Sequence, residues 1–314
     1  MKILITGALG HIGSYLIRTL PHTLQARDLT LIDDFTTQRY ASLFNLPDAA
    51  TYHFHELDVC KADLGPLVQN CDFVIHLAAI TDATSSVEHP ELIERNFAAT
   101  TAVAQACLAA RKPMLFSSTT SVYGSQKEIV DEACSKDDLK PQSPYAEVKL
   151  REEALLRKLN AEQGLALAIV RFGTICGVSP GMRFHTAVNK FCFQAVMRQP
   201  ITVWTTAMHQ RRPYLELSDA GRAVAHIIRS GLFTGEIFNV VTENSTPDEI
   251  IGQIRRHVPE LAIKLVDSPI MNQLSYHVSS DKFCNTGFTF QGSIAAGISD
   301  TIEWLKNSNS SSKL

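Results

Sequence analysis

Residues 5–13 read ITGALGHIG, and this stretch places three glycines directly after an apolar run: Gly7, Gly10 and Gly13. A glycine where a strand ends permits a tight turn, a second lets the backbone approach a phosphate, and a third lets the following helix pack against the strand. The free N–H groups at the start of such a helix favour a pyrophosphate. The stretch therefore predicts a strand, a phosphate-binding turn and a helix.

An acidic residue follows at the distance that such a turn requires. The run 29–34, LTLIDD, reads as a second strand, and Asp33 lies about 20 residues beyond Gly13. Its carboxylate is expected to accept hydrogen bonds from ribose hydroxyls and to repel a 2′-phosphate, which favours NAD over NADP. The alternative is that Asp33 and Asp34 simply end a strand at a turn. The order of strand, glycine loop, helix, strand and acid favours the cofactor site.

Strands and helices alternate through the first half of the chain. Runs that read as strands lie at 2–6, 29–34, 51–59, 71–79, 112–124 and 165–173, and runs with helical composition lie at 12–20, 90–110 and 145–164. Alternation of this kind is typical of parallel strands joined by right-handed crossovers. We therefore expect an α/β protein with a doubly wound parallel Rossmann sheet and a smaller C-terminal substrate-binding α/β part.

The alternation breaks near residue 175, which suggests a division of the chain. Residues 1–174 are expected to form the NAD-binding Rossmann domain. Residues 175–305 are expected to be mainly substrate-binding, with some strands and helices returning to the Rossmann domain. The terminal run KNSNSSSKL, 306–314, has low complexity and is expected to be a disordered tail.

Composition argues against several classes of partner and site. The formal net charge is −3, whereas nucleic acid and acidic membrane surfaces need a clustered basic excess. No apolar run approaches the roughly 20 residues of a membrane span. Seven cysteines without paired spacing predict reduced thiols, and the histidine spacing predicts no metal site. These features favour the cytoplasm, although the final Ser-Lys-Leu also reads as a peroxisomal address.

The run YAEVK places Tyr145 and Lys149 four residues apart, on one face of the expected helix. A lysine ammonium near a phenol stabilises the phenolate, and so does a positively charged nicotinamide. Both are expected to lower the pKa of Tyr145 towards neutrality, where the hydroxyl serves as a general base or acid. The alternative is an ordinary surface helix, on which the spacing Y-x-x-x-K is common.

Further motifs carry a resemblance to a known family. The runs HLAA (76–79), SSTTSVYG (117–124), YAEVK (145–149) and RRPYLELSD (211–219) follow the glycine loop in order. With them, the chain resembles the extended short-chain dehydrogenase/reductase family. The resemblance covers nearly the whole chain and is closest to the NAD-dependent nucleotide-sugar epimerase/dehydratase branch, which includes UDP-glucose 4-epimerases.

The resemblance implies roles for individual residues. It implies that Thr119, Tyr145 and Lys149 are catalytic, with the Thr119 hydroxyl bonded to the sugar oxygen that is oxidised. The implied NAD contacts are Gly7, Gly10, His11, Ile12, Gly13, Asp33, Asp34, Asp58, Val59, Leu77, Ala78, Ala79, Asn96, Ser117, Tyr145, Lys149 and Phe172. The implied substrate contacts are Thr81, Thr119, Tyr145, Thr174, His185 and Arg212. Arg212 would clamp the substrate diphosphate, and His11 is expected either to stack near the pyrophosphate or to face solvent.

The implied activity is that of an NAD-dependent epimerase of a nucleotide-diphosphate sugar, acting at C4 of a UDP-hexose or related sugar. The reaction would pass through a transient 4-keto sugar with recycled NAD. The alternative is an NAD(P)-dependent nucleotide-sugar reductase or dehydrogenase with net turnover of the cofactor. Related 4,6-dehydratases carry an Asp-Glu pair where this chain has Thr120 and Ser121, so dehydration is disfavoured.

Two further expectations follow from the resemblance. Most relatives hold the diphosphate with a second arginine late in the chain, but the corresponding run 268–278, SPIMNQLSYHV, contains none. That contact is either weaker or replaced, for example by Asn272 or His277. The family also implies a homodimer, formed through the helices expected at 90–110 and 145–164.

Overall fold

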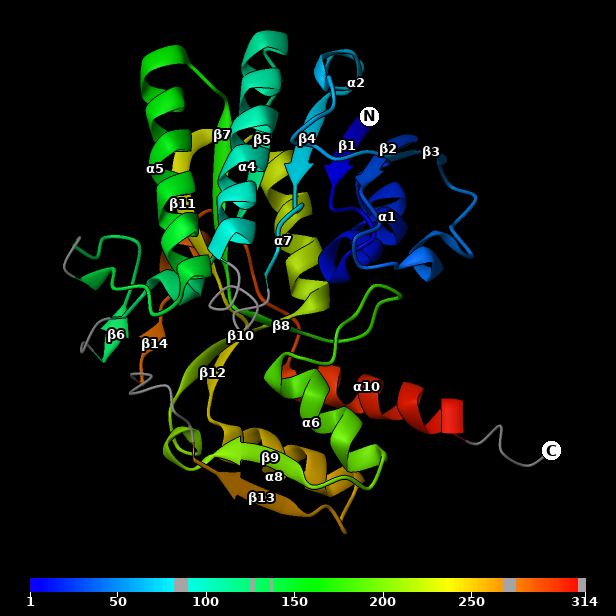
Figure 1. Cartoon of the computed structure of the whole chain (residues 1–314), viewed down its shortest axis with the longest axis vertical. Helices are drawn as coiled ribbons and strands as arrows, with labels where there is room; N and C mark the ends of the chain where they lie inside the picture. Colours follow the sequence, from blue (N-terminus) through cyan, green and yellow to red (C-terminus); the bar gives the residue numbers. More distant parts are fainter. Residues whose placement is uncertain (82–89, 125–127, 136–137, 268–274, 310–314) are drawn as a thin grey trace.

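A parallel sheet of seven strands forms the centre of the protein (Figure 1). The structure is a computed structural model, and it describes residues 1–81, 90–124, 128–135, 138–267 and 275–309, the side chains of 90–93, 308 and 309 excepted. The strand order is β11 (Thr234–Val240), β7 (Leu167–Phe172), β5 (Met114–Thr119), β4 (Phe73–His76), β1 (Lys2–Thr6), β2 (Asp28–Asp33) and β3 (Thr51–Glu56). Every neighbouring pair in this sheet is parallel.

Helices cover both faces of the sheet. Helices α1 (His11–Thr23) and α7 (Leu217–Ser230) pack on one face, and α4 (Pro90–Ala110) and α5 (Pro144–Gln163) pack side by side on the other, with α2 (Gly65–Gln69) beside α4. Along β1, Ile3 and Ile5 belong to the first apolar layer and Leu4 to the second, because successive side chains of a strand point to opposite faces. This is the doubly wound Rossmann fold predicted from the sequence.

The strand order reverses next to β1. The chain runs outward from β1 to β2 and β3, and then returns to place β4 on the other side of β1. The register pairs Thr6 at the end of β1 with Ile32 near the end of β2 and with His76 at the end of β4. In sheets of this kind, ligands bind outside the carboxyl ends of the strands at the point of reversal.

A smaller part lies beyond these strand ends (Figure 1). Strands β8 (Thr174–Cys176), β10 (Arg212–Glu216) and β12 (Glu243–Ser245) form one sheet, β9 (Ile201–Trp204) pairs with β13 (Ile263–Val266), and β6 (Ile129–Val130) pairs with β14 (His277–Val278). Helices α6 (Ala187–Val196), α8 (Pro247–His257) and α10 (Ile294–Asn309) share an apolar core, and α9 (Asp281–Cys284) is a short helix next to β11. Strand β11 and helix α7 come from the same C-terminal half of the chain as this smaller part. β11 is nevertheless an edge strand of the seven-stranded sheet, and α7 packs on a face of that sheet.

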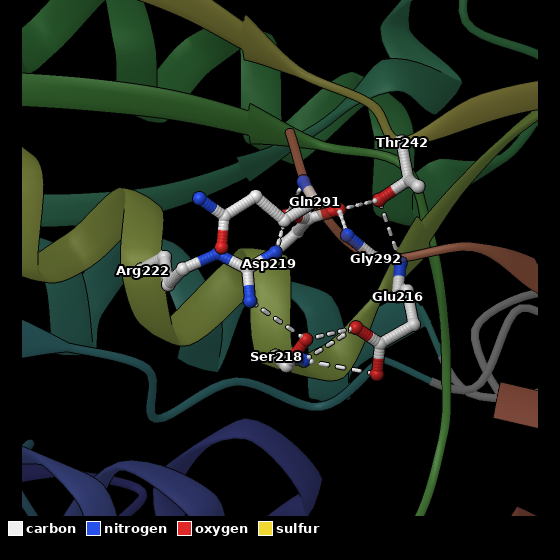
Figure 2. A network of polar contacts seen from close by, with 7 residues as sticks. All are labelled: Glu216, Ser218, Asp219, Arg222, Thr242, Gln291 and Gly292. Carbon is white, nitrogen blue, oxygen red and sulfur yellow. Dashed lines mark hydrogen bonds and ion pairs between the residues drawn. The ribbon is translucent and has the colours of Figure 1, made fainter. Parts of the chain in front are cut away.

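A buried carboxylate joins the two parts (Figure 2). Asp219 on α7 has no exposed surface. It accepts hydrogen bonds from Thr242 Oγ1 at 2.8 Å and from the backbone N–H groups of Gln291 and Gly292 at 3.0 Å each, and it pairs with Arg222. The segment that leads into α10 is therefore anchored on a helix of the Rossmann sheet.

The helix bounds differ in places from the expected ones. Helix α4 spans 90–110 as predicted, whereas α1 extends to Thr23 and includes Pro21. Helix α10 continues through 306–309, where the sequence predicts a disordered tail, and 310–314 lie outside the described residues. No helix in the described part of the chain is both long enough and apolar enough to cross a membrane.

Candidate active site

The glycine loop forms a tight turn between β1 and α1. Gly7 has a φ of +67°, and a Cβ placed there would lie 2.6 Å from the backbone nitrogen of Ala78. A Cβ on Gly13 would lie 2.5 Å from the carbonyl oxygen of Gly7, so neither position accepts a side chain. At Gly10 the nearest atom would be 3.3 Å away. The turn keeps its backbone bare at the start of α1, which suits a pyrophosphate.

Two adjoining cavities open at this turn. The larger cavity, about 380 Å³, extends over the ends of β2 and β3 towards α4. The smaller cavity, about 240 Å³, extends over the ends of β5 and β7 towards the start of α5. Gly7, Gly10, Leu77, Ala79 and Thr81 line both cavities, so the two together form one continuous cleft along the strand ends.

The residues predicted for the site divide between these cavities. Those lining the larger cavity are Gly7, Gly10, Asp33, Asp34, Asp58, Val59, Leu77, Ala78, Ala79, Thr81 and Asn96. Those lining the smaller cavity are Gly7, Gly10, His11, Ile12, Gly13, Leu77, Ala79, Thr81, Ser117, Thr119, Tyr145, Lys149, Phe172, Thr174 and His185. Arg212 is in neither set.

Asp33 lies at the end of β2 with its carboxylate held in place. It accepts hydrogen bonds from the backbone N–H groups of Leu9 and Phe35 at 3.1 Å each. Burial raises its pKa, and these two hydrogen bonds oppose the rise. Each carboxylate oxygen has a second acceptor position, so the group can still accept a hydrogen bond from a ligand in the larger cavity.

An arginine that the sequence analysis did not single out connects the other two acids of the larger cavity. Arg95 on α4 lies 2.8 Å from Asp34 and 3.1 Å from Asp58. Burial acts to raise the pKa of Asp58, but hydrogen bonds from the Cys60 N–H and from Arg95 outweigh it and lower the pKa. The bridge ties the loops after β2 and β3 to α4. In the sequence, this bridge is indicated only by a basic residue directly before Asn96.

The three predicted catalytic residues meet in the smaller cavity. Thr119 ends β5, and its Oγ1 accepts a hydrogen bond from the Ser121 N–H at 3.1 Å. Helix α5 begins with a Ser143 cap and Pro144 in its first turn, which places Tyr145 at the cavity wall. The Lys149 Nζ lies 5.9 Å from the centre of the Tyr145 ring, one helical turn away.

The pKa of Tyr145 differs from the expected one. Burial raises it above its usual range, and Glu152 adds to the rise, while Lys149 and Arg183 act to lower it. The predicted lowering by Lys149 is present but is smaller than the cost of burying a phenolate. Lys149 therefore does not by itself bring the pKa of Tyr145 towards neutrality in this structure.

Comparison with known proteins assigns the family. The model of the NAD dependent epimerase/dehydratase family matches residues 3–240. The chain belongs to this family. The chain is 31% identical over 251 residues to an uncharacterized UDP-glucose epimerase of Bacillus subtilis (strain 168), covering 76% of each chain. It is 27% identical to a dTDP-glucose 4,6-dehydratase of Streptomyces niveus, covering 98% of this chain and 93% of the other.

A solved structure agrees in fold along nearly the whole chain. It is the UDP-glucuronic acid 4-epimerase of Bacillus cereus in complex with UDP-glucuronic acid and NAD. The TM-score is 0.84 at 25% identity, over 98% of this chain and 99% of the other. The family depends on NAD, and the bare glycine turn together with the carboxylate at the end of β2 fits that cofactor. The predicted family membership, fold and cofactor are thereby confirmed.

Two arginines that the sequence analysis missed line both cavities of this epimerase/dehydratase family member. A Cβ on Gly10 would lie 3.6 Å from Arg39 Nη1, so this guanidinium lies over the glycine turn. Burial lowers the pKa of Arg39, and nearby Asp33 opposes this. Arg183 donates to Thr81 and lies 2.5 Å from His185. Both arginines are suited to anionic groups in the cleft.

His11 is held by the fold through one edge of its ring, and its expected place near the pyrophosphate stays a prediction. Its Nε2 lies 2.9 Å from the carbonyl oxygen of Gly177. Burial lowers its pKa to about 4, so the ring is neutral near pH 7 and Nε2 carries the donated hydrogen. His11 therefore links the start of α1 to the segment after β8, although it also forms part of the cavity wall.

Arg212 lies on β10, outside the described linings of both cavities. Its guanidinium stacks 5.3 Å from the centre of the Tyr276 ring, and it donates to Gln210 at 3.1 Å. Tyr276 in turn donates to the carbonyl oxygen of Thr120 at 3.4 Å. The late segment expected near the diphosphate falls partly outside the described residues, Asn272 included, and His277 lies on β14. The assignment of Arg212 to the diphosphate stays a prediction.

Proposed function

We propose that this protein is an NAD-dependent epimerase of a nucleotide-diphosphate sugar, acting at C4 of a UDP-hexose or a related UDP-sugar. One observation carries the proposal. The smaller cavity brings Thr119, Tyr145 and Lys149 to one end of the cleft, and its described lining contains no aspartate or glutamate. The UDP-sugar epimerases among the relatives support the same substrate class.

The residues of the smaller cavity suit one proton transfer in each direction. Tyr145 takes the proton of the C4 hydroxyl as that carbon is oxidised, and returns it when the carbon is reduced from the other face. Thr119 donates or accepts a hydrogen bond at the same oxygen, and Lys149 stabilises the phenolate. Bound NAD supplies the chemistry that side chains lack, by accepting a hydride and giving it back.

Dehydration is the reaction of several relatives, and the cavity argues against it here. Elimination of water from a 4-keto sugar needs an acid and a base next to Thr119. Thr120 is buried and donates to the carbonyl oxygen of Phe172 at 3.3 Å, and the Ser121 hydroxyl accepts a hydrogen bond from Thr119 at 3.1 Å. Neither hydroxyl ionises near neutral pH, so neither replaces a carboxyl group.

A product analysis tests this proposal. The purified protein is incubated, without added cofactor, with UDP-glucose, UDP-galactose, UDP-glucuronic acid and UDP-N-acetylglucosamine, and the products are identified by NMR. We expect a C4 epimer of at least one sugar and no 4-keto-6-deoxy product. Stoichiometric formation of NADH from added NAD, without an epimer, would instead identify a dehydrogenase.

The assembly and the compartment are part of the same proposal. A homodimer through α4 and α5 is supported by the packing of these two helices along one face of the molecule, and light scattering after size-exclusion chromatography measures its mass. The cytoplasm is supported by seven cysteines that all remain free thiols. Imaging of a fusion protein in the source cell tests the location.

A further inference from the structure

A buried carboxylate lies directly behind the catalytic lysine. Glu152 follows Lys149 on α5, and its Oε2 lies 3.1 Å from Lys149 Nζ. The two side chains are 1% and 3% exposed, so the pair is shielded from solvent and from salt. The Lys149 ammonium also lies 4.5 Å from the centre of the Phe116 ring. Glu152 is thus the nearest described anion to the charge that is expected to activate Tyr145.

The other carboxylate oxygen ends a chain of hydrogen bonds through the core. Thr100 Oγ1 donates to Glu152 Oε1 at 2.6 Å. Since a hydroxyl has one hydrogen, the 3.1 Å contact between His76 Nε2 and Thr100 is donated by the ring. Burial lowers the pKa of His76 to about 3, so the ring is neutral and its Nδ1 accepts from Thr6 at 2.6 Å. Thr6 accepts from the Ala78 N–H at 3.4 Å.

Every donor in this chain points towards Glu152. The carboxylate oxygen at the end of the chain is an acceptor, so this direction satisfies it. Thr6, His76, Thr100 and Glu152 are all buried, so the Glu152 side chain is held in place by partners that solvent does not reach. A carboxylate held in this way fixes the position of the Lys149 ammonium that lies 3.1 Å from it.

The charged and titratable groups around this site come from three elements. Those that act on Tyr145 are Lys149 and Glu152 of α5 and Arg183 of the segment between β8 and α6. His76 of β4 faces Lys149, Arg151 of α5 faces Glu152, and His185 contacts Arg183. Among these groups only Glu152 carries a negative charge.

We propose that Glu152 is a positioning residue for the epimerase: its carboxylate fixes the Lys149 ammonium at the cavity wall and offsets part of the positive charge that lysine presents to Tyr145. The balance keeps the hydroxyl able both to take and to return a proton. The proposal rests on the role of Tyr145 in the proposed function.

Titration of the Tyr145 phenolate tests it. Near-ultraviolet phenolate absorbance is followed against pH for the NAD-loaded protein, and the curve of the matching Tyr145→Phe variant is subtracted to isolate Tyr145. In Glu152→Gln, which keeps the shape and the bond from Thr100, we expect the Tyr145 titration to move to lower pH by about one unit. The acid limb of the rate against pH should move the same way.

The matched control is Glu147→Gln, which removes the same charge from an exposed position of α5, between Tyr145 and Lys149. It should leave the titration unchanged. If Glu152→Gln does not fold, Glu152→Asp keeps the buried charge but withdraws it by one methylene, and a smaller shift in the same direction is expected. No shift, or a shift to higher pH, in a folded Glu152 variant overturns the inference. Undiminished epimerisation by Tyr145→Phe alone would overturn the proposed function instead.

Discussion

The two cavities hold their charges in different ways. In the larger cavity, Arg95 lies 2.8 Å from Asp34 and 3.1 Å from Asp58 with 37% of its side chain exposed. At the smaller cavity, Lys149 of the wall lies a similar 3.1 Å from Glu152 behind it, and both side chains are almost wholly buried. Water and salt weaken the first set of interactions and leave the second strong. The charges of the larger cavity can therefore adjust to a ligand and to the solvent, whereas those beside the smaller cavity stay fixed.

Replacement of Tyr145 by phenylalanine should have the largest effect and should separate the two cavities. It removes the proton acceptor but leaves the larger cavity unchanged, so we expect epimerisation to fall by about 10²- to 10⁴-fold with unchanged NAD binding. Rate assays and calorimetric NAD titrations measure the two quantities. Tyr40→Phe, at an exposed ring, is the control, and a joint loss of activity and NAD binding would contradict the separation.

Gly7→Ala should act where both cavities meet. The new Cβ would lie 2.6 Å from the Ala78 nitrogen at a φ of +67°, so the turn must open, and we expect NAD binding to be lost together with activity. Gly164→Ala is a matched control, because its φ is +74° and nothing lies within 4 Å of the added Cβ. That variant should lose only about 1 kcal/mol of unfolding free energy and should bind NAD normally. Normal NAD binding by Gly7→Ala would show that the turn is not needed.

Low pH should destabilise the folded protein through the buried His76. The unfolded His76 takes up a proton near pH 6.5, whereas the folded ring does so only at about pH 3. The stability that His76 contributes is therefore complete above pH 6.5 and declines as pH falls towards 3, by about 2 kcal/mol at pH 5. Urea unfolding at pH 7 and pH 5 measures it. The decline should be smaller in His76→Gln, and an equal decline would assign it to other groups.

Arg95→Met should have the smallest effect, confined to the larger cavity. An exposed bridge of this kind contributes about 1 kcal/mol or less, so we expect NAD affinity to weaken by no more than roughly fivefold at low salt and by less at high salt. Arg151→Met, which breaks the exposed pair with Glu94 outside both cavities, should leave NAD affinity unchanged. A loss of turnover at saturating NAD would place Arg95 in the chemistry instead.

The part of the site that depends on contiguous sequence was predictable. The glycine turn and the Tyr145–Lys149 pair each follow from spacing within a short run, and the acid that ends β2 follows from its distance to the glycines. The parallel sheet follows from the alternation of strands and helices, whereas its strand order comes from the structure. Glu152 was not predictable in this way, because the run LREEALLRK looks like a solvated helix face. Its burial results from the packing of α4 on α5, which brings Thr100 to it across 52 residues of sequence.

The contacts made by loops were harder to predict. Arg39 follows Asp33 in a loop, and only the backbone path, with positive φ at Phe35 and Gln38, brings it over the glycine turn. His11 was expected near the pyrophosphate or in solvent, but the segment after β8 supplies Gly177 as its partner. Sequence similarity around Arg212 implied a contact with the diphosphate, but it did not indicate that Arg212 begins β10 or that its guanidinium stacks on Tyr276.

The carboxylate of Asp219 also has a consequence for biosynthesis. Its partners Gln291 and Gly292 are made 72 and 73 residues later, after every strand of the large sheet. As the chain leaves the ribosome, the Rossmann sheet can form first. The segment that contains Gln291 and Gly292 can bond to Asp219 only after it has been synthesised. Translation that stops before residue 291 would leave the buried Asp219 carboxylate without these two donors. Quality-control proteases would then meet a protein whose large sheet is complete but whose segment leading into α10 is missing.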